Sequence, residues 1–165
     1  AHVVNVQGDE PLIPPALINQ VAQNLAINQT AGISTLCEQI EEIDAVFNPN
    51  VVKVVFDHKG FANYFSRAPI PWARESFGDE VNILPTSAQY FRHIGIYAYT
   101  KSLLANFVAW PESHLESLEK LEQLRVIENG RSIYVDVLDN APPAGIDTPN
   151  DLQRANQLFI SQLNT

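Results

Sequence analysis

Apolar residues follow two different spacings along the chain, and these spacings predict an ordered series of strands and helices. Alternating or β-branched runs predict strands at residues 3–6, 31–37, 51–56, 61–65, 91–99 and 132–138. Helical spacing predicts helices at 14–28, 41–47, 101–108, 113–130 and 149–159. The order predicts an α/β fold: a mainly parallel, Rossmann-like sheet flanked by helices, incomplete at its N-terminal side, with an antiparallel hairpin inserted at 51–65.

The domain organisation predicted from the chain is simple. There is no internal repeat, low-complexity tract or linker, so residues 1–165 are expected to form a single α/β domain. Residues 73–89 are polar and have few apolar anchors, which predicts a mobile loop between two strands.

Composition excludes several classes of function. A net charge of −9 argues against a nucleic-acid or anionic-membrane surface, because both require basic patches. No apolar run approaches the length of a membrane span. The single cysteine, Cys37, excludes an intrachain disulfide and a cysteine-based zinc site, and its apolar neighbours favour a buried structural thiol.

Two aspartates are placed where chemistry is possible. The valines of residues 3–6 predict a strand buried on both faces, Gly8 permits close backbone approach, and Asp9 follows at the edge where α/β sheets bind ligands. Asp147 lies at a second boundary, before the predicted N-cap Thr148. From the residues alone, a solvent-facing turn acid is the favoured interpretation of Asp9 and an equal one for Asp147.

The predicted strand at 91–99 has one polar face. His93, Gly95, Tyr97 and Tyr99 share it by alternation. His93 and Tyr97 are expected about 13 Å apart along the strand, with open space over Gly95 for a small polyhydroxylated molecule. A satisfied core histidine is the alternative interpretation of His93.

Three further side chains are candidates for binding. Arg67 stands beside a stretch stiffened by two prolines, where a guanidinium can hold a carboxylate or phosphate, and a structural salt bridge explains it equally well. Glu122 and Gln123 lie beside the leucine stripe of the helix predicted at 113–130. They could reach a cleft, although the pattern alone favours solvated positions.

Sequence motifs of several enzyme classes are absent. The two glycine-rich phosphate-binding motifs, G-x-x-x-x-G-K-[ST] and G-x-G-x-x-G, do not occur. There is also no H-E-x-x-H, no G-x-S-x-G and no cysteine pair. The remaining candidates for chemistry are the two dispersed aspartates, Asp9 and Asp147. They fit the requirement of magnesium, which is held by one or two carboxylates together with substrate phosphates.

Six stretches carry a family resemblance: VNVQGDEPLIP, FNPNVVKVV, YFSRAPIPW, FRHIGIYAY, LEKLEQLRVIENG and GIDTPNDL. They occur in the same order, from residue 3 to about 152, in the 3-deoxy-manno-octulosonate cytidylyltransferases, which this chain resembles. That family opens with a strand and a loop rich in Arg, Gly and Lys that grips the triphosphate, and nothing here is similar to it. Because the chain begins with Ala1 and contains no Met, we expect it to be the C-terminal portion of a longer protein.

The resemblance implies the reaction and the roles of residues. Family members couple CTP to 3-deoxy-D-manno-octulosonate (Kdo), with Mg²⁺, giving CMP-Kdo and pyrophosphate for lipopolysaccharide synthesis. The roles carried over by motif are metal binding and catalysis for Asp9 and Asp147, nucleotide binding for Gln7 and Gly8, and sugar-acid binding for Arg67, His93, Tyr97, Glu122 and Gln123.

The resemblance also implies a homodimer in the bacterial cytoplasm, with no nucleic acid or membrane as a partner. Two alternatives stay open: the same reaction on 8-amino-Kdo or a sialic acid, and a non-catalytic module for sugar binding or dimerisation. We expect the 165-residue chain alone to be inactive, because the triphosphate-binding segment is not in it.

Overall fold

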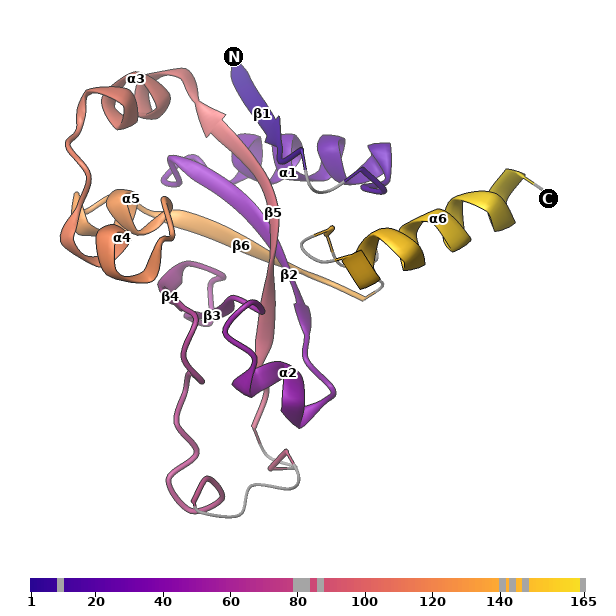
Figure 1. The fold of residues 1–165 in the computed structure, drawn as a ribbon. Helices are drawn as coiled ribbons and strands as arrows, with labels where there is room; N and C mark the ends of the chain where they lie inside the picture. Colours follow the sequence, from indigo (N-terminus) through magenta and orange to yellow (C-terminus); the bar gives the residue numbers. More distant parts are fainter. Residues whose placement is uncertain are drawn as a thin grey trace.

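A six-stranded sheet forms the centre of the molecule (Figure 1). The computed structural model describes residues 1–8, 11–78, 84–85, 88–139, 142, 145–146 and 149–163. The strands are β1 (His2–Val6), β2 (Ile33–Gln39), β3 (Lys53–Phe56), β4 (Ala62–Ser66), β5 (Phe91–Thr100) and β6 (Ile133–Leu138). Their order is β4-β3-β5-β2-β6, and β1 pairs with β5.

The sheet is mixed, which confirms the α/β class and corrects the prediction of a mainly parallel sheet. β5 is antiparallel to β1, β2 and β3, and the described parallel pair is β2 with β6. β1, β2 and β6 do run in one direction, but β5 lies between β1 and β2 and reverses the pairing. The predicted hairpin is confirmed: β3 and β4 are antiparallel, and Asp57 Oδ1 accepts hydrogen bonds from the N–H groups of Lys59 and Phe61 in its turn.

Six helices are described around the sheet. They are α1 (Pro15–Ile27), α2 (Ile43–Phe47), α3 (Lys101–Ala109), α4 (His114–Glu119), α5 (Leu124–Glu128) and α6 (Pro149–Leu163). The single helix predicted at 113–130 is wrong, because Lys120 takes a left-handed backbone (φ 54°) that ends α4. Leu118 is consequently exposed, while Leu121 and Leu124 are buried.

The two faces of the sheet bury separate cores. On one face α1 packs against Leu36, Ile94 and Ile96, and on the other α3 and α5 pack against a cluster that includes Phe65 and Tyr97. Figure 1 shows α1 on one side of β5 and α3, α4 and α5 gathered on the other. The alternation predicted for β5 is therefore confirmed, since its odd and even residues enter different cores.

The first strand differs from its prediction as a strand buried on both faces. Val3 is 44% exposed and Val6 36% exposed. The reason is that β1 pairs only with β5 within the described residues, and α1 packs against it from one side.

Among all the residues that the structure describes, no helix has the length and apolar character needed to cross a membrane.

The segment 73–89 was predicted to be a mobile loop, and residues 79–83 and 86–87 of it lie outside the described part. Phe77 provides an apolar anchor that the prediction overlooked. It is 5% exposed, stacks on Tyr90 and makes edge contacts with Phe47 and Trp72. The first part of this segment is thus fixed to the sheet end near α2.

Candidate functional site

The polar face of β5 brings its aromatic side chains together. The ring centroids of His93 and Tyr97 are 5.2 Å apart, and those of Tyr97 and Tyr99 are 5.8 Å apart. The expected separation of about 13 Å applies to a straight strand. Here the pairing with β2 shifts, so that Thr35 faces Tyr97 while the next residue of β2 faces Ile94. The expected separation of the His93 and Tyr97 side chains is wrong, because their rings lie side by side.

The space predicted over Gly95 is occupied by the side chain of Gln7. A Cβ atom at Gly95 would lie 2.2 Å from Gln7 Oε1. Gln7 follows directly after Val6, which pairs with Ile96, so β1 delivers the carboxamide across the neighbouring strand. The structure therefore brings a predicted nucleotide contact, Gln7, to the predicted sugar-acid residues His93 and Tyr97.

His93 is partly buried and has fixed neighbours. Its Nε2 lies 2.9 Å from Thr35 Oγ1, and its ring meets Phe65 edge-on with centroids 5.1 Å apart. Burial, aided by the charge of Arg92, lowers the pKa of His93 to about 3. The imidazole is consequently neutral near pH 7, where it can exchange hydrogen bonds with a polar ligand without contributing a positive charge.

The two phenols of β5 remain protonated. Burial raises the pKa of Tyr97 well above its ordinary value, with smaller contributions from Tyr99 and Glu122, and burial with Glu122 raises the pKa of Tyr99 to about 12. Glu122 therefore acts on this row electrostatically, and its side chain is exposed, as its pattern predicted. Gln123 is only 7% exposed, contrary to that pattern, because the break at residue 120 makes it the N-cap of α5.

Arg67 is held by backbone carbonyls rather than by an ion pair. Its Nε donates to Glu119 O at 2.7 Å, and its Nη1 donates to Pro49 O at 3.0 Å. The salt-bridge alternative is not observed among the described residues. Nη2 has no hydrogen bond within that part of the chain, so one nitrogen of the guanidinium remains available for an anionic oxygen.

Two charged residues that the sequence analysis missed position Arg67. The Glu119 carboxylate accepts hydrogen bonds from Ser66 Oγ (2.6 Å) and from the N–H of Arg67 (2.9 Å). Lys53, which is 0% exposed, donates through Nζ to Arg67 O at 2.6 Å and also to Asn48 O and Val51 O. Burial lowers the pKa of Lys53 to about 8. The chain entering the stiff segment after β4 is thus fixed from both sides.

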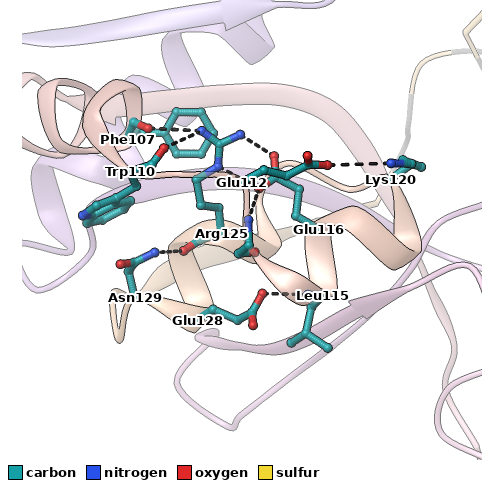
Figure 2. A network of polar contacts seen from close by, with 10 residues as sticks. Phe107, Trp110, Glu112, Leu115, Glu116, Lys120, Arg125, Glu128 and Asn129 are labelled. Atoms are coloured by element: carbon teal, nitrogen blue, oxygen red, sulfur yellow. Dashed lines mark hydrogen bonds and ion pairs between the residues drawn. The ribbon is translucent and has the colours of Figure 1, made fainter.

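Glu119 is the last residue of α4, and Glu122 and Gln123 lie between α4 and α5, so these two helices form the α4–α5 wall. Figure 2 shows the contacts by which Arg125 holds this wall. Arg125 Nε donates to Glu116 Oε2 at 2.7 Å, and its Nη2 pairs with Glu116 Oε1. Its guanidinium carbon lies 4.3 Å from the ring centroid of Phe107, and Nη1 donates to the carbonyl of Phe107. One guanidinium therefore joins α3, α4 and α5.

The predicted metal site cannot be placed in the same way. Asp9 and Asp147 both lie outside the described residues, and Gly8 is exposed with nothing within 4 Å of an added Cβ. Among the residues that are described, no group of three or more His, Cys, Asp or Glu side chains is arranged to hold a metal ion.

Comparison with known proteins places this arrangement in a family. The family described as "Cytidylyltransferase" matches residues 1–133. The chain belongs to the cytidylyltransferase family.

Curated relatives agree closely with this cytidylyltransferase chain. It is 58% identical over 163 residues to the 3-deoxy-manno-octulosonate cytidylyltransferase of Marinobacter nauticus, which covers 96% of this chain and 62% of the relative. It is 57% identical over 157 residues to the protein of that name from Hahella chejuensis, covering 95% of this chain and 62% of the relative. The chain thus spans about three fifths of the length of these relatives.

A solved structure confirms the fold. The structure of CMP:2-keto-3-deoxy-manno-octonic acid synthetase complexed with CTP superposes with a TM-score of 0.85 at 35% sequence identity. The match covers 98% of this chain and 62% of that chain. The mixed sheet with flanking helices is therefore a nucleotidyltransferase-like fold.

Proposed function

We propose that this chain functions within a full-length cytidylyltransferase that couples CTP to Kdo, giving CMP-Kdo and pyrophosphate for lipopolysaccharide synthesis. The observation that carries the proposal is the 58% identity to a 3-deoxy-manno-octulosonate cytidylyltransferase over 96% of the chain. The relative solved with CTP supports CTP as the nucleotide substrate.

The residues of this chain divide the work of substrate binding. Arg67 takes the carboxylate of the sugar acid through a guanidinium held by Glu119 O and Pro49 O. His93 and Tyr97 bind hydroxyl groups of the sugar acid, and Glu122 and Gln123 contribute from the α4–α5 wall. Together with Arg67, these residues form the proposed binding site for the sugar acid, called the acceptor pocket below. Gln7 lies over Gly95 in this row, and together with Gly8 it binds the nucleotide.

The reaction is an in-line displacement at the α-phosphorus of CTP. The sugar hydroxyl forms the new O–P bond as the bond to pyrophosphate breaks, and the hydroxyl proton is released. Positioning by the acceptor pocket converts this bimolecular step into one within a single complex.

Magnesium belongs to the same proposal. Asp9 and Asp147 offer carboxylate oxygens, the donor type that Mg²⁺ prefers, and would hold it together with phosphate oxygens of CTP. Bound there, the ion supplies neutralisation of phosphate charge. The proposal also includes a homodimer and a location in the bacterial cytoplasm, since the relatives come from bacteria.

The test is pyrophosphate release by the full-length protein with CTP, magnesium and, in parallel, Kdo, 8-amino-Kdo or a sialic acid. We expect the greatest kcat/KM with Kdo. Asp9→Asn and Asp147→Asn should each reduce kcat severely without unfolding the protein, since asparagine keeps the shape and removes the charge. No turnover with Kdo would overturn the proposal, and a preference for either other acid would replace the substrate.

The isolated chain provides a separate test. We expect residues 1–165 alone to release little or no pyrophosphate, while binding the sugar acid weakly through the acceptor pocket. Robust turnover by this chain would show that the triphosphate-binding segment of the family is dispensable, whereas binding with no turnover even in the full-length protein would favour the non-catalytic module.

A further inference from the structure

A threonine hydroxyl behind His93 has a defined role. Thr35 is 0% exposed in β2, at the point where the pairing with β5 shifts register. Its Oγ1 lies 2.8 Å from Ile96 O, 3.3 Å from Ile94 O and 2.9 Å from His93 Nε2. Two carbonyl oxygens and one imidazole nitrogen therefore compete for one hydroxyl hydrogen.

The proton count decides how these groups pair. Carbonyl oxygens only accept, and a hydroxyl has one hydrogen to donate. If that hydrogen pointed at His93 Nε2, the lone pairs of Oγ1 would face Ile96 O at 2.8 Å with no proton between them. The favourable arrangement gives the hydroxyl hydrogen to Ile96 O, and Nε2–H of His93 then donates to Oγ1.

This arrangement leaves the other nitrogen of His93 without a proton. A neutral imidazole has one N–H, so a proton on Nε2 makes Nδ1 an acceptor. Burial keeps the ring neutral by lowering the pKa of His93 to about 3. Nδ1 has no hydrogen bond within the described residues, and the His93 side chain is only partly buried, which leaves Nδ1 for a ligand.

We propose that Thr35 is a positioning residue that holds His93 in the Nε2–H tautomer, so that Nδ1 accepts a hydrogen bond from a hydroxyl of the sugar acid. This rests on the proposed function and adds a rule of specificity to it. An unprotonated Nδ1 accepts a hydrogen bond from a hydroxyl group and repels a carboxylate. The carboxylate of the sugar acid therefore binds to Arg67. The two ends of a polyhydroxylated acid are thereby distinguished, and the acid lies in one orientation across β5.

The first test reads the tautomer directly, in the full-length protein without substrate. Nitrogen-15 NMR of the imidazoles at pH 7, with His93 assigned by the loss of its signals in His93→Gln, should show the Nε2–H form. Thr35→Ser keeps the hydroxyl and should keep this form, whereas Thr35→Val keeps the shape and should lose it. An Nδ1–H tautomer in the wild type, or an unchanged tautomer in Thr35→Val, would overturn the proposal.

The second test reads the consequence for binding. Thr35→Val should raise KM for Kdo by roughly five- to tenfold, the effect of one weakened hydrogen bond, with KM for CTP within about twofold of wild type. Thr35→Ser keeps the hydroxyl and should therefore leave KM for Kdo near its wild-type value. Equal increases in both KM values would mean that Thr35 is only a packing residue and would also overturn the proposal. If the protein has no activity on Kdo, the proposed function fails, but the NMR result still decides the role of Thr35.

Discussion

Gln7 and Gly95 are complementary: the carboxamide of one lies where a side chain on the other would have to be. A Cβ atom on Gly95 would stand 2.2 Å from Gln7 Oε1 and 3.1 Å from its Cδ. The two residues come from neighbouring antiparallel strands, β1 and β5. Gly95 therefore permits Gln7 to lie over the row that contains His93 and Tyr97. The lack of a side chain at residue 95 is what makes room for the Gln7 carboxamide.

Replacing Gly95 with alanine should displace Gln7 without unfolding the protein. The clash involves the far end of a flexible side chain, which can swing away at small cost. In the full-length protein we expect Gly95→Ala to weaken substrate binding about as much as Gln7→Ala, roughly five- to tenfold in KM for the substrate that Gln7 contacts. Steady-state kinetics with each substrate varied, together with melting temperatures, measures this.

A double-mutant cycle supplies the control for that experiment. Once Gln7→Ala has removed the carboxamide, adding Gly95→Ala has nothing left to displace, so the double variant should match the Gln7→Ala single variant. Additive losses in KM, or a large drop in melting temperature for Gly95→Ala alone, would mean that the glycine supports the strand itself.

His93 should make the protein sensitive to acid. Its folded pKa, about 3, is below its ordinary value of 6.5, so the unfolded chain binds more protons between these values. The contribution of His93 to stability is fully present above about pH 6.5 and is lost as pH falls toward 3. The slope from this group is at most about 1.4 kcal/mol per pH unit.

Urea unfolding of the full-length protein at pH 7 and pH 5 tests this. The stability lost between the two pH values should be smaller in His93→Gln than in wild type. His58→Gln is the matched control, because His58 is exposed in the turn between β3 and β4 and should keep the wild-type difference. Identical losses in all three proteins would contradict a buried neutral His93.

Local sequence patterns predicted the individual strands and helices better than they predicted how the strands pair in the sheet. The alternation of β5 and the β3–β4 hairpin depend on neighbours within a few residues, and both were correct. The mixed sheet was not foreseen, because inserting β5 between β1 and β2 depends on pairing between residues 52 to 98 positions apart in the chain. The break at Lys120 was also missed, since a lysine gives no signal for a left-handed backbone.

The candidate site divides in the same way. His93 and Tyr97 could be chosen because they share one face of one strand, whereas Thr35 and Glu119 act across the fold on residues 58 and 52 positions away. One signal for Lys53 was present: it is a lone charge inside an apolar strand, VVKVV. Such a position requires partners, and here they are three carbonyl oxygens.

Arg67 should bind the acid and leave CTP unaffected. In the full-length protein Arg67→Ala is expected to raise KM for Kdo by about tenfold to hundredfold, the cost of a hydrogen bond to a charged group, with little change in KM for CTP. Arg67→Lys should recover little, because an ammonium cannot span Glu119 O, Pro49 O and the substrate together. Arg131→Ala, at an exposed arginine, is the matched control. Equal increases in both KM values would remove Arg67 from the acceptor pocket.

The pair of Glu116 and Arg125 should contribute far more to stability than its exposed neighbour, the pair of Glu112 and Lys120. Glu116 is 5% exposed, whereas the side chain of Glu112 is 58% exposed and lies 3.7 Å from Lys120 Nζ. Breaking a buried pair leaves an uncompensated charge, so Glu116→Gln should cost about 3 kcal/mol of unfolding free energy, while Glu112→Gln should cost under about 1 kcal/mol.

The difference between these two variants should depend on pH in a definite direction. The hydrogen bonds from Arg125 lower the pKa of Glu116 below its ordinary value of 4.5. Its contribution is therefore present above about pH 4.5 and is lost as pH falls through the folded value. Urea unfolding at pH 7 and again below pH 4 should show the cost of Glu116→Gln shrinking. If Glu116→Gln is as mild as Glu112→Gln at pH 7, Arg125 does not hold α4 and α5 together.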